Sequence, residues 1–319
     1  MNFINNNKNV KQTTLKQKIL FKGVGIHNGK AVSMSIEPSE PNTGIVFERT
    51  DLNGNNLINA VIDNVDETCL CTKIKNGYGI SVSTIEHLMA AFNGLNIDNV
   101  KIKINAPEVP ALDGSSYEYT KKILSSGIEF QKYDRKYIKI LKNINVNEDN
   151  RHISAIPSEK LSLKVSINYP NTIIGHSELS YEHSQNNFLK HLSKARTFTL
   201  AEDVNKMRLA GYAMGGSMNN AIVVDKYNIL NSNGLRVDKE FVKHKTLDCI
   251  GDFYLFGMPL IGSVNCLAPG HRLNQMFVKE VLSDKKNYTI DTLELHNSSN
   301  QYIKALSNNH FSQEEINVA

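Results

Sequence analysis

Long apolar segments are missing from this sequence of 319 residues. No run approaches the eighteen or so apolar residues that a bilayer-crossing helix needs. The N-terminus, residues 1–9, is polar and lacks the apolar centre of a signal peptide. We therefore expect a cytoplasmic protein with no integral membrane segment.

The sequence also has few cysteines and a small net charge. Four cysteines, Cys69, Cys71, Cys249 and Cys266, do not make a disulfide framework in a chain this long. The Cys69-Leu-Cys71 spacing is not the C-x-x-C of a zinc ribbon, and burial as a small hydrophobe is the favoured interpretation of Cys71. A formal net charge of +4, without aromatics interleaved on a basic face, argues against a nucleic-acid partner and is compatible with an anionic small substrate.

What remains is the composition of a folded globular protein, with 40% hydrophobic and 21% charged residues in a chain long enough for two packed domains. Each half shows the same order of strands, a helix, a strand, a proline-containing loop and a second helix. This order indicates an internal duplication, so we predict an α+β fold of two similar domains of β-sheet packed on helices. The predicted divisions are a disordered N-terminus at 1–12, domain I at 13–134, domain II at 135–287 and a polar C-terminal tail at 288–319, with the linker near 129–137.

The segment Phe241–Asp252 is the most informative stretch, because apolar residues recur in it at helical spacing. On that helix His244 and Asp248 lie one turn apart on one face. Nitrogen and oxygen ligands at this spacing suit a borderline divalent ion such as zinc. Most such pairs are solvated surface pairs, so this one needs a third ligand to indicate a metal site.

A second helix is predicted to begin near Ser83 and to end at Gly94, with Glu86 and His87 in its first turn. Taken alone, Ser83-x-x-Glu86 fits a capping box and His87 fits a satisfied structural histidine. The duplication changes this interpretation. If the halves pack about a pseudo-two-fold axis, this helix faces the helix of His244 across the domain interface, where ligand sites are favoured. His87 is then the third ligand.

His271 is a further candidate. It follows Gly270 and precedes a helix predicted from Leu273, which places it on a loop. A histidine on a loop of a rigid scaffold is a better functional candidate than one in a core.

The chain from about Thr13 to Asn287 resembles the zinc-dependent UDP-3-O-acyl-N-acetylglucosamine deacetylase family of lipid A biosynthesis. Many separated motifs in the right order carry the resemblance, and any one alone would be weak. These motifs are Gly23–Lys30, Ser83–His87, Asn105–Glu108, Leu112–Ser115, Ala195–Phe198, Gly215–Ser217, Ala221–Asp225, Asn233–Arg236, His244–Asp248 and Gly270–His271.

The resemblance implies two similar α+β domains, each with an insert, and an active site at their interface. The second insert would form a passage for the acyl chain of the substrate. It also implies roles for particular residues. These are zinc ligation by His87, His244 and Asp248, general base by Glu86, general acid by His271, oxyanion stabilisation by Thr197, and positions near the metal for Lys245 and Asp252.

The expected substrate, an acylated UDP-sugar, needs an anion site and an apolar slot. Lys245 is the candidate for the anion, with a surface lysine as the alternative. Phe198, Leu70, Gly216 and Met218 are the candidates for the substrate-facing surface, with core packing as the alternative for the apolar side chains. Met218 stands where an aromatic is expected, and the resemblance places Cys71 close to the metal, where a sulfur could bind excess zinc.

The expected protein is therefore a monomeric enzyme that uses zinc, or alternatively iron. Two other functions stay open: a metal amidohydrolase for another acylated sugar, and a non-catalytic paralogue that binds a nucleotide sugar. The filled ligand and acid–base positions argue against the paralogue.

Overall fold

The structure, a computed structural model, describes residues 9–66 and 70–293. Residues 1–8 of the predicted disordered N-terminus lie outside these ranges, as do Cys69 and residues 294–319 of the predicted tail. None of the helices in the described ranges has both the length and the apolar character that crossing a membrane requires.

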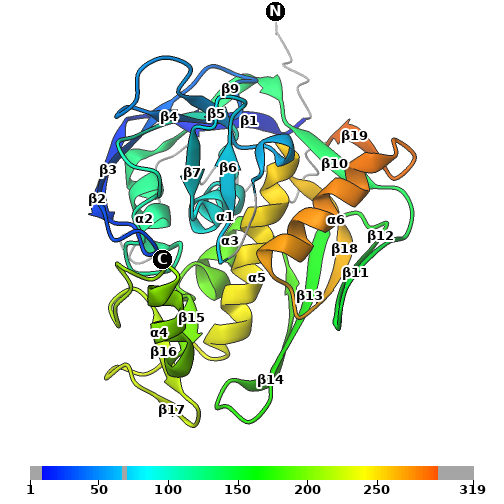
Figure 1. The fold of residues 1–319 in the computed structure, drawn as a ribbon. Helices are drawn as coiled ribbons and strands as arrows, with labels where there is room; N and C mark the ends of the chain where they lie inside the picture. The colour runs from blue at the N-terminus through cyan, green and yellow to red at the C-terminus, as the bar shows by residue number, and fades with distance from the viewer. Residues whose placement is uncertain (1–8, 67–69, 294–319) are drawn as a thin grey trace, which may run out of the picture.

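Six helices and nineteen strands follow one another along the described chain (Figure 1). The helices are α1 (Glu86–Gly94), α2 (Tyr117–Ser126), α3 (Gln185–Asn187), α4 (Ala201–Leu209), α5 (Glu240–Phe253) and α6 (His271–Ser283), with shorter turns at η1 (Ile62–Asn64), η2 (Phe188–Leu192) and η3 (Tyr254–Phe256). The strands are β1 (Lys11–Leu15), β2 (Ile19–Val24), β3 (Ala31–Pro38), β4 (Ile45–Arg49), β5 (Leu57–Asn59), β6 (Lys73–Lys75), β7 (Ser81–Ser83), β8 (Val100–Ile104), β9 (Ile128–Asp134), β10 (Lys136–Ile140), β11 (Ile144–Glu148), β12 (Arg151–Ile156), β13 (Leu161–Tyr169), β14 (Gly175–Glu182), β15 (Phe198–Leu200), β16 (Ile222–Asp225), β17 (Asn228–Ile229), β18 (Leu260–Leu267) and β19 (Tyr288–Thr292).

The two large sheets repeat one topology. In the first half β2, β3, β8, β4 and β5 lie side by side, with β3 antiparallel and β4 parallel to β8. In the second half β11, β12, β18, β13 and β14 repeat this arrangement, with β12 antiparallel and β13 parallel to β18. A helix precedes each central strand and another follows it, as α1 and α2 flank β8 and α5 and α6 flank β18. The predicted duplicated α+β fold is confirmed.

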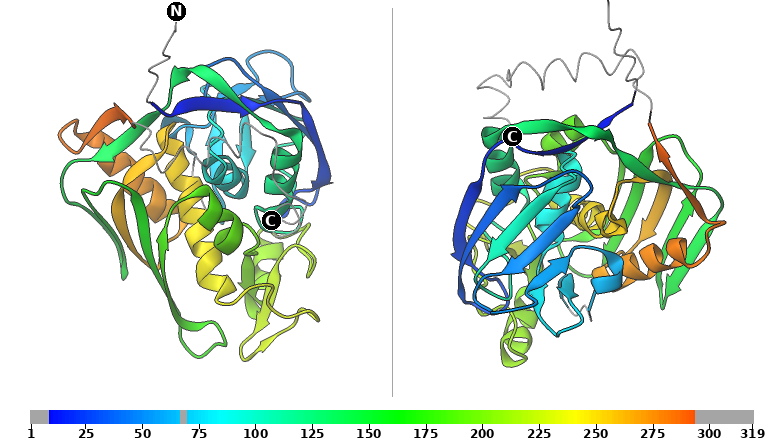
Figure 2. Two further views of the ribbon diagram at one scale, coloured as in Figure 1. Left: turned by 180° about the vertical axis from the view of Figure 1, so that it is seen from behind. Right: turned by 90° about the horizontal axis from the view of Figure 1, so that it is seen from above.

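Alternation along the strands explains how each sheet is covered. In β8 the apolar Val100, Ile102 and Ile104 are buried, whereas Lys101 and Lys103 are partly exposed. A period of two places the apolar side chains on one face of the sheet, against the helices. Each half has its own apolar core. The right-hand view of Figure 2 shows α1 and α5 together between the two sheets.

A glycine allows these two central helices to touch. A Cβ atom at Gly251 of α5 would lie 2.1 Å from the backbone oxygen of Glu86 and 3.1 Å from the nitrogen of Ala90, both in α1. Nearby, the Asn93 amide donates a hydrogen bond of 2.9 Å to the Ile250 carbonyl. The equivalent helices of the two halves are therefore in backbone contact, which brings short side chains on both within reach of one another.

Three segments expected to lack structure are strands instead. β1 begins at Lys11, inside the predicted frayed terminus, and pairs with β9. The predicted linker at 129–137 consists of β9 and β10, and β19 lies in the predicted tail and pairs with β10. These predictions are wrong because partners distant in the chain supply the backbone hydrogen bonds. The domain boundaries themselves stay a prediction.

Candidate metal and active site

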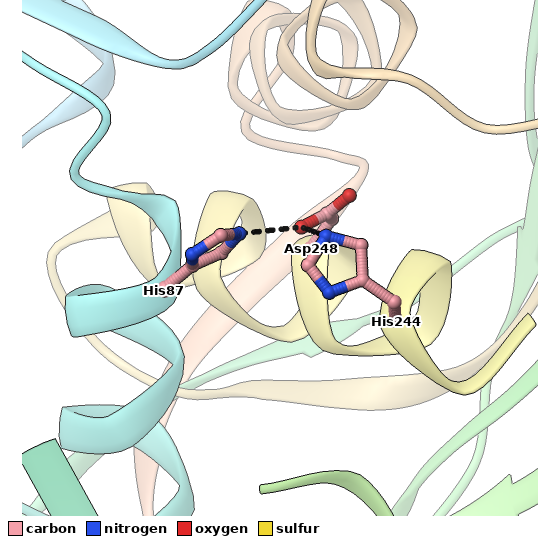
Figure 3. A group of neighbouring side chains, drawn as sticks. All are labelled: His87, His244 and Asp248. Carbon is pink, nitrogen blue, oxygen red and sulfur yellow. Dashed lines mark ion pairs between the residues drawn. The ribbon is translucent and has the colours of Figure 1, made fainter. Parts of the chain in front are cut away.

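Three buried side chains from the two central helices converge (Figure 3). His87 comes from α1, and His244 and Asp248 come from α5. The Nε2 atoms of His87 and His244 lie 3.6 and 3.3 Å from Oδ1 of Asp248. All three ligand atoms lie within 4.8 Å of one another. The structure thus brings together the three residues that the sequence singled out as ligands.

The chemistry of this group fits a divalent metal ion. Oδ1 of Asp248 is buried and has no hydrogen-bond partner, which is costly for a carboxylate oxygen unless a cation satisfies it. Nδ1 of His244 lies 3.0 Å from the Ala195 carbonyl, so that nitrogen donates there and leaves Nε2 free as a ligand. Two imidazoles and one carboxylate are a donor set of catalytic zinc sites, which keep a fourth position open.

The electrostatics keep both candidate ligands of α5 in their metal-binding forms. Burial lowers the pKa of His244 to about 3, despite the opposing charge of Asp248, so the imidazole is neutral. Burial raises the pKa of Asp248, but His244 and Lys245 outweigh it and hold that pKa well below its usual range. A neutral imidazole and an ionised carboxylate are the forms that bind metals.

Glu86 and His271 face each other beside this group. Nε2 of His271 lies 3.7 Å from Oε1 of Glu86, and both side chains are almost fully buried. Nδ1 of His271 donates to Oδ2 of Asp252 over 2.8 Å. Burial lowers the pKa of His271, but the carboxylates of Asp252 and Glu86 outweigh it and raise that pKa to about 9. Burial raises the pKa of Glu86, against the influence of His271 and His87.

Two local predictions at this pair are wrong. His271 is the first residue of α6 rather than a loop residue, because Gly270 is extended and the helix begins directly after it. The helix predicted to begin near Ser83 begins three residues later at Glu86, because Ser83 ends β7. The capping box weighed as an alternative for Ser83 and Glu86 does not form, since α1 has no side-chain cap. Thr84 between them has a φ of 61°, a left-handed conformation that is rare for a β-branched residue. The Glu86 carboxylate does not cap the helix, and the residue lines a cavity.

A cavity of about 640 Å³ opens over the group. Eleven of the twelve residues predicted for the site line it. They are Leu70, Glu86, His87, Thr197, Phe198, Gly216, Met218, His244, Lys245, Asp248 and His271. Asp252 does not line it and stands behind His271. Leu70 is 40% exposed and Met218 is 50% exposed, so core packing is excluded for these two.

Lys245 is not a surface lysine. Its Nζ donates to Oδ2 of Asp248 over 3.0 Å and lies 5.7 Å from the centre of the Phe198 ring. Burial lowers the pKa of Lys245, but Asp248 outweighs it and raises that pKa above its usual value. Lys245 therefore presents a fixed positive charge to the cavity.

One wall of the cavity belongs to the segment between β14 and α5. Here β15, β16 and β17 form a small sheet, with α4 beside it (Figure 1). No residue of α4 is buried, yet Val204 and Met207 of this helix line the cavity. This segment corresponds to the second insert that the resemblance implies.

Cys71 is buried, as the sequence analysis favoured, and is not among the residues that line the cavity. Burial, with a smaller contribution from Glu86, raises the pKa of its thiol to about 12. The thiol therefore stays protonated at neutral pH.

Two residues that the sequence does not single out, Thr72 and Asn274, support the Glu86–His271 pair. The Thr72 backbone N–H donates to Oε2 of Glu86 over 3.0 Å, and the Thr72 hydroxyl donates to Oδ1 of Asp252 over 2.5 Å. The Asn274 amide donates to Oδ2 of Asp252 over 2.7 Å. Asp252 is 180 residues from Thr72, so no local spacing could indicate this contact.

Glu108 explains why three of the motifs occur together. Its buried carboxylate accepts hydrogen bonds from the backbone N–H groups of His27 and Asn28, each over 2.8 Å. It also accepts one from the Thr84 hydroxyl over 2.9 Å. The sequence places Glu108 in one of the motifs but carries no local indication of this role. The structure shows that it holds the loop of His27, a cavity-lining residue, against the start of α1.

Comparisons with known proteins agree with this geometry. Residues 12–283 match the family model described as "UDP-3-O-acyl N-acetylglycosamine deacetylase". The UDP-3-O-acyl-N-acetylglucosamine deacetylase of Campylobacter fetus subsp. fetus (strain 82-40) is 39% identical over 298 residues, covering 93% of this chain and 100% of that protein. The protein of the same name from Haemophilus influenzae (strain 86-028NP) is 40% identical, covering 89% and 94%. That of Wigglesworthia glossinidia brevipalpis is 37% identical, covering 91% and 98%. The chain belongs to the UDP-3-O-acyl N-acetylglycosamine deacetylase family.

Proposed function

We propose that this chain hydrolyses the acetamide of UDP-3-O-acyl-N-acetylglucosamine to acetate and a free amine, a step of lipid A biosynthesis, with zinc held by His87, His244 and Asp248. One observation carries the assignment of residues: the three ligand atoms, the Glu86–His271 pair and the cavity meet at one place between the halves. The names of the relatives support the choice of substrate.

A divalent metal bound there would polarise the acetyl carbonyl and lower the pKa of water to ~7. Glu86 accepts the proton of the attacking water. Its Oε2 is already occupied by the Thr72 N–H, which leaves Oε1 to face the cavity. The Thr197 hydroxyl, on the cavity wall, donates to the oxyanion that develops on the carbonyl oxygen, a role worth roughly 3 kcal/mol in comparable sites.

His271 supplies the second proton. With a pKa of about 9, its imidazole is protonated at neutral pH and donates from Nε2 to the departing glucosamine nitrogen. Asp252 holds the ring by accepting from Nδ1, which fixes the direction of Nε2. Lys245 offers its charge to the anionic part of the substrate. Leu70, Phe198 and Met218 offer apolar surface to the acyl chain, and Gly216 also lines the cavity.

The test is hydrolysis by the purified protein loaded with zinc. We expect about one equivalent of bound metal, acetate release from the acylated UDP-N-acetylglucosamine, and loss of that release on chelation. Nucleotide-sugar binding without acetate release would favour the non-catalytic paralogue. Equal turnover of an acylated sugar that lacks the UDP group would favour the other amidohydrolase.

His271 is expected to set the alkaline limit of activity. The protonated imidazole is the donor, so turnover falls as the pH rises through its pKa of about 9. The charge of a bound cation moves this limit to lower pH. The pH dependence of kcat/KM measures it.

In His271→Gln the alkaline limb should disappear and turnover should fall by roughly 10²–10⁴-fold. Bound zinc should stay near one equivalent, because His271 is not a ligand. Loss of the metal in this variant would show that the roles are wrongly assigned.

A further inference from the structure

Thr72 touches both sides of the acid–base pair. It is fully buried and lies directly before β6. Its N–H donates to Oε2 of Glu86 over 3.0 Å, and its hydroxyl donates to Oδ1 of Asp252 over 2.5 Å. Asp252 in turn accepts from Nδ1 of His271. One residue therefore connects the proton acceptor to the group that orients the proton donor.

The Asp252 carboxylate is held from three directions. Oδ1 accepts from Thr72, and Oδ2 accepts from His271 and Asn274. The Thr72 hydroxyl also lies 3.3 Å from Nδ1 of His271, but that nitrogen already donates to Oδ2, so the hydroxyl proton points to Oδ1. Because Asp252 is fully buried, rotating it would leave a buried donor unpaired.

Oε1 of Glu86 and Nε2 of His271 stand 3.7 Å apart, beyond a direct hydrogen bond. If these two groups paired, neither would be available to water or to the leaving nitrogen. Thr72 holds Glu86 by the oxygen that faces away from His271, and it holds His271 through Asp252 on the far side of the ring. The geometry points to Thr72 as a positioning residue for deacetylation, which keeps the proton acceptor and the proton donor apart. This inference rests on the proposed roles of Glu86 and His271.

Thr72→Val tests it, since valine keeps the size of the side chain and the backbone N–H but lacks the hydroxyl. We expect kcat to fall by roughly 10–100-fold, the range known for outer partners of metal-site residues. KM should change by less than about twofold, because Thr72 is not among the cavity-lining residues. Thr72→Ser restores the hydroxyl and should return kcat to within about threefold of wild type. Zinc content should not change in either variant.

Thr120→Val is the matched control. Thr120 is also fully buried, its hydroxyl donates to the Ser116 carbonyl at the start of α2, and it is not among the residues that line the cavity. We expect the Thr120→Val variant to unfold at a somewhat lower temperature and to keep its kcat.

The Thr72→Val, Asp252→Asn double variant then asks whether Thr72 acts through Asp252. The effects of substitutions within one hydrogen-bond network are not additive, so the kcat of the double variant should be little lower than that of Asp252→Asn alone.

Three results would overturn the inference: a wild-type kcat in Thr72→Val, a loss of zinc in that variant, or independent multiplying losses in the double variant. These results leave the proposed function intact as long as the wild-type protein releases acetate. A zinc-loaded wild-type protein that releases none would overturn the proposed function and this inference together.

Discussion

His244→Ala is expected to lose bound metal and activity together. In the proposed site His244 is one of three ligands, and its Nε2 is available because Nδ1 donates to the Ala195 carbonyl. Removing it leaves two ligands on different helices, so zinc affinity should fall by more than the roughly 10–100-fold that outer partners cost. Acetate release should fall to background. Zinc content after dialysis and the rate of acetate release measure the two effects.

Deleting a buried imidazole also leaves a void, so a second variant separates metal loss from misfolding. Asp248→Asn is nearly isosteric and removes the negative charge of the carboxylate. Oδ1 of that carboxylate is buried without a hydrogen-bond partner. It should lose the metal while keeping the far-UV circular dichroism of wild type. His152→Ala serves as the control, because His152 lies on β12 and its imidazole contacts Asn147. Full zinc content in both ligand variants would refute the metal site.

Glu86→Gln is expected to abolish proton transfer while the metal stays. An amide cannot accept the proton of the attacking water, and general bases contribute roughly 10²–10⁴-fold to rates. We therefore expect kcat to fall by that factor. Zinc should stay near one equivalent, because the Glu86 side chain is not a ligand in this assignment. The neighbouring His87 makes the zinc measurement essential.

Glu178→Gln is the control for removing one negative charge. Glu178 lies on β14, where its partly exposed carboxylate pairs with Lys164. A surface pair of this kind is worth at most about 1 kcal/mol, so activity should not change.

A second measurement addresses the acid limb of the pH profile. Since the base must be ionised and burial raises its pKa, wild-type activity should fall at low pH, and this limb should be absent in Glu86→Gln. Near wild-type turnover in Glu86→Gln would place the base elsewhere.

Much of the fold and the candidate site followed from local patterns. Helical spacing at His244 and Asp248 predicted one face of α5, and the repeated order of elements predicted that His87 lies opposite. The structure places all three together. Residues such as Val100, Ile102 and Ile104 alternate so regularly that their strand and its buried face could be predicted without a tertiary context.

Other features depend on partners far away in the chain. β9 and β19 are rich in polar residues and are strands because β1 and β10 pair with them. The capping box at Ser83 fits a common motif, yet β7 and the left-handed Thr84 displace the start of α1. Thr72 shows most clearly what local sequence cannot predict. Threonine occurs in many local structures, and the contact of Thr72 with Asp252 exists only in the folded chain.

The duplicated topology places one proposed ligand in the first half and two in the second. Neither half alone supplies all three proposed ligands, so a bound ion would tether the halves as a reversible cross-link. Its binding free energy would add to folding stability, so stripping it should lower the thermal midpoint. If the halves were supplied as two polypeptides, zinc should strengthen their association, because only the associated pair offers all three ligands.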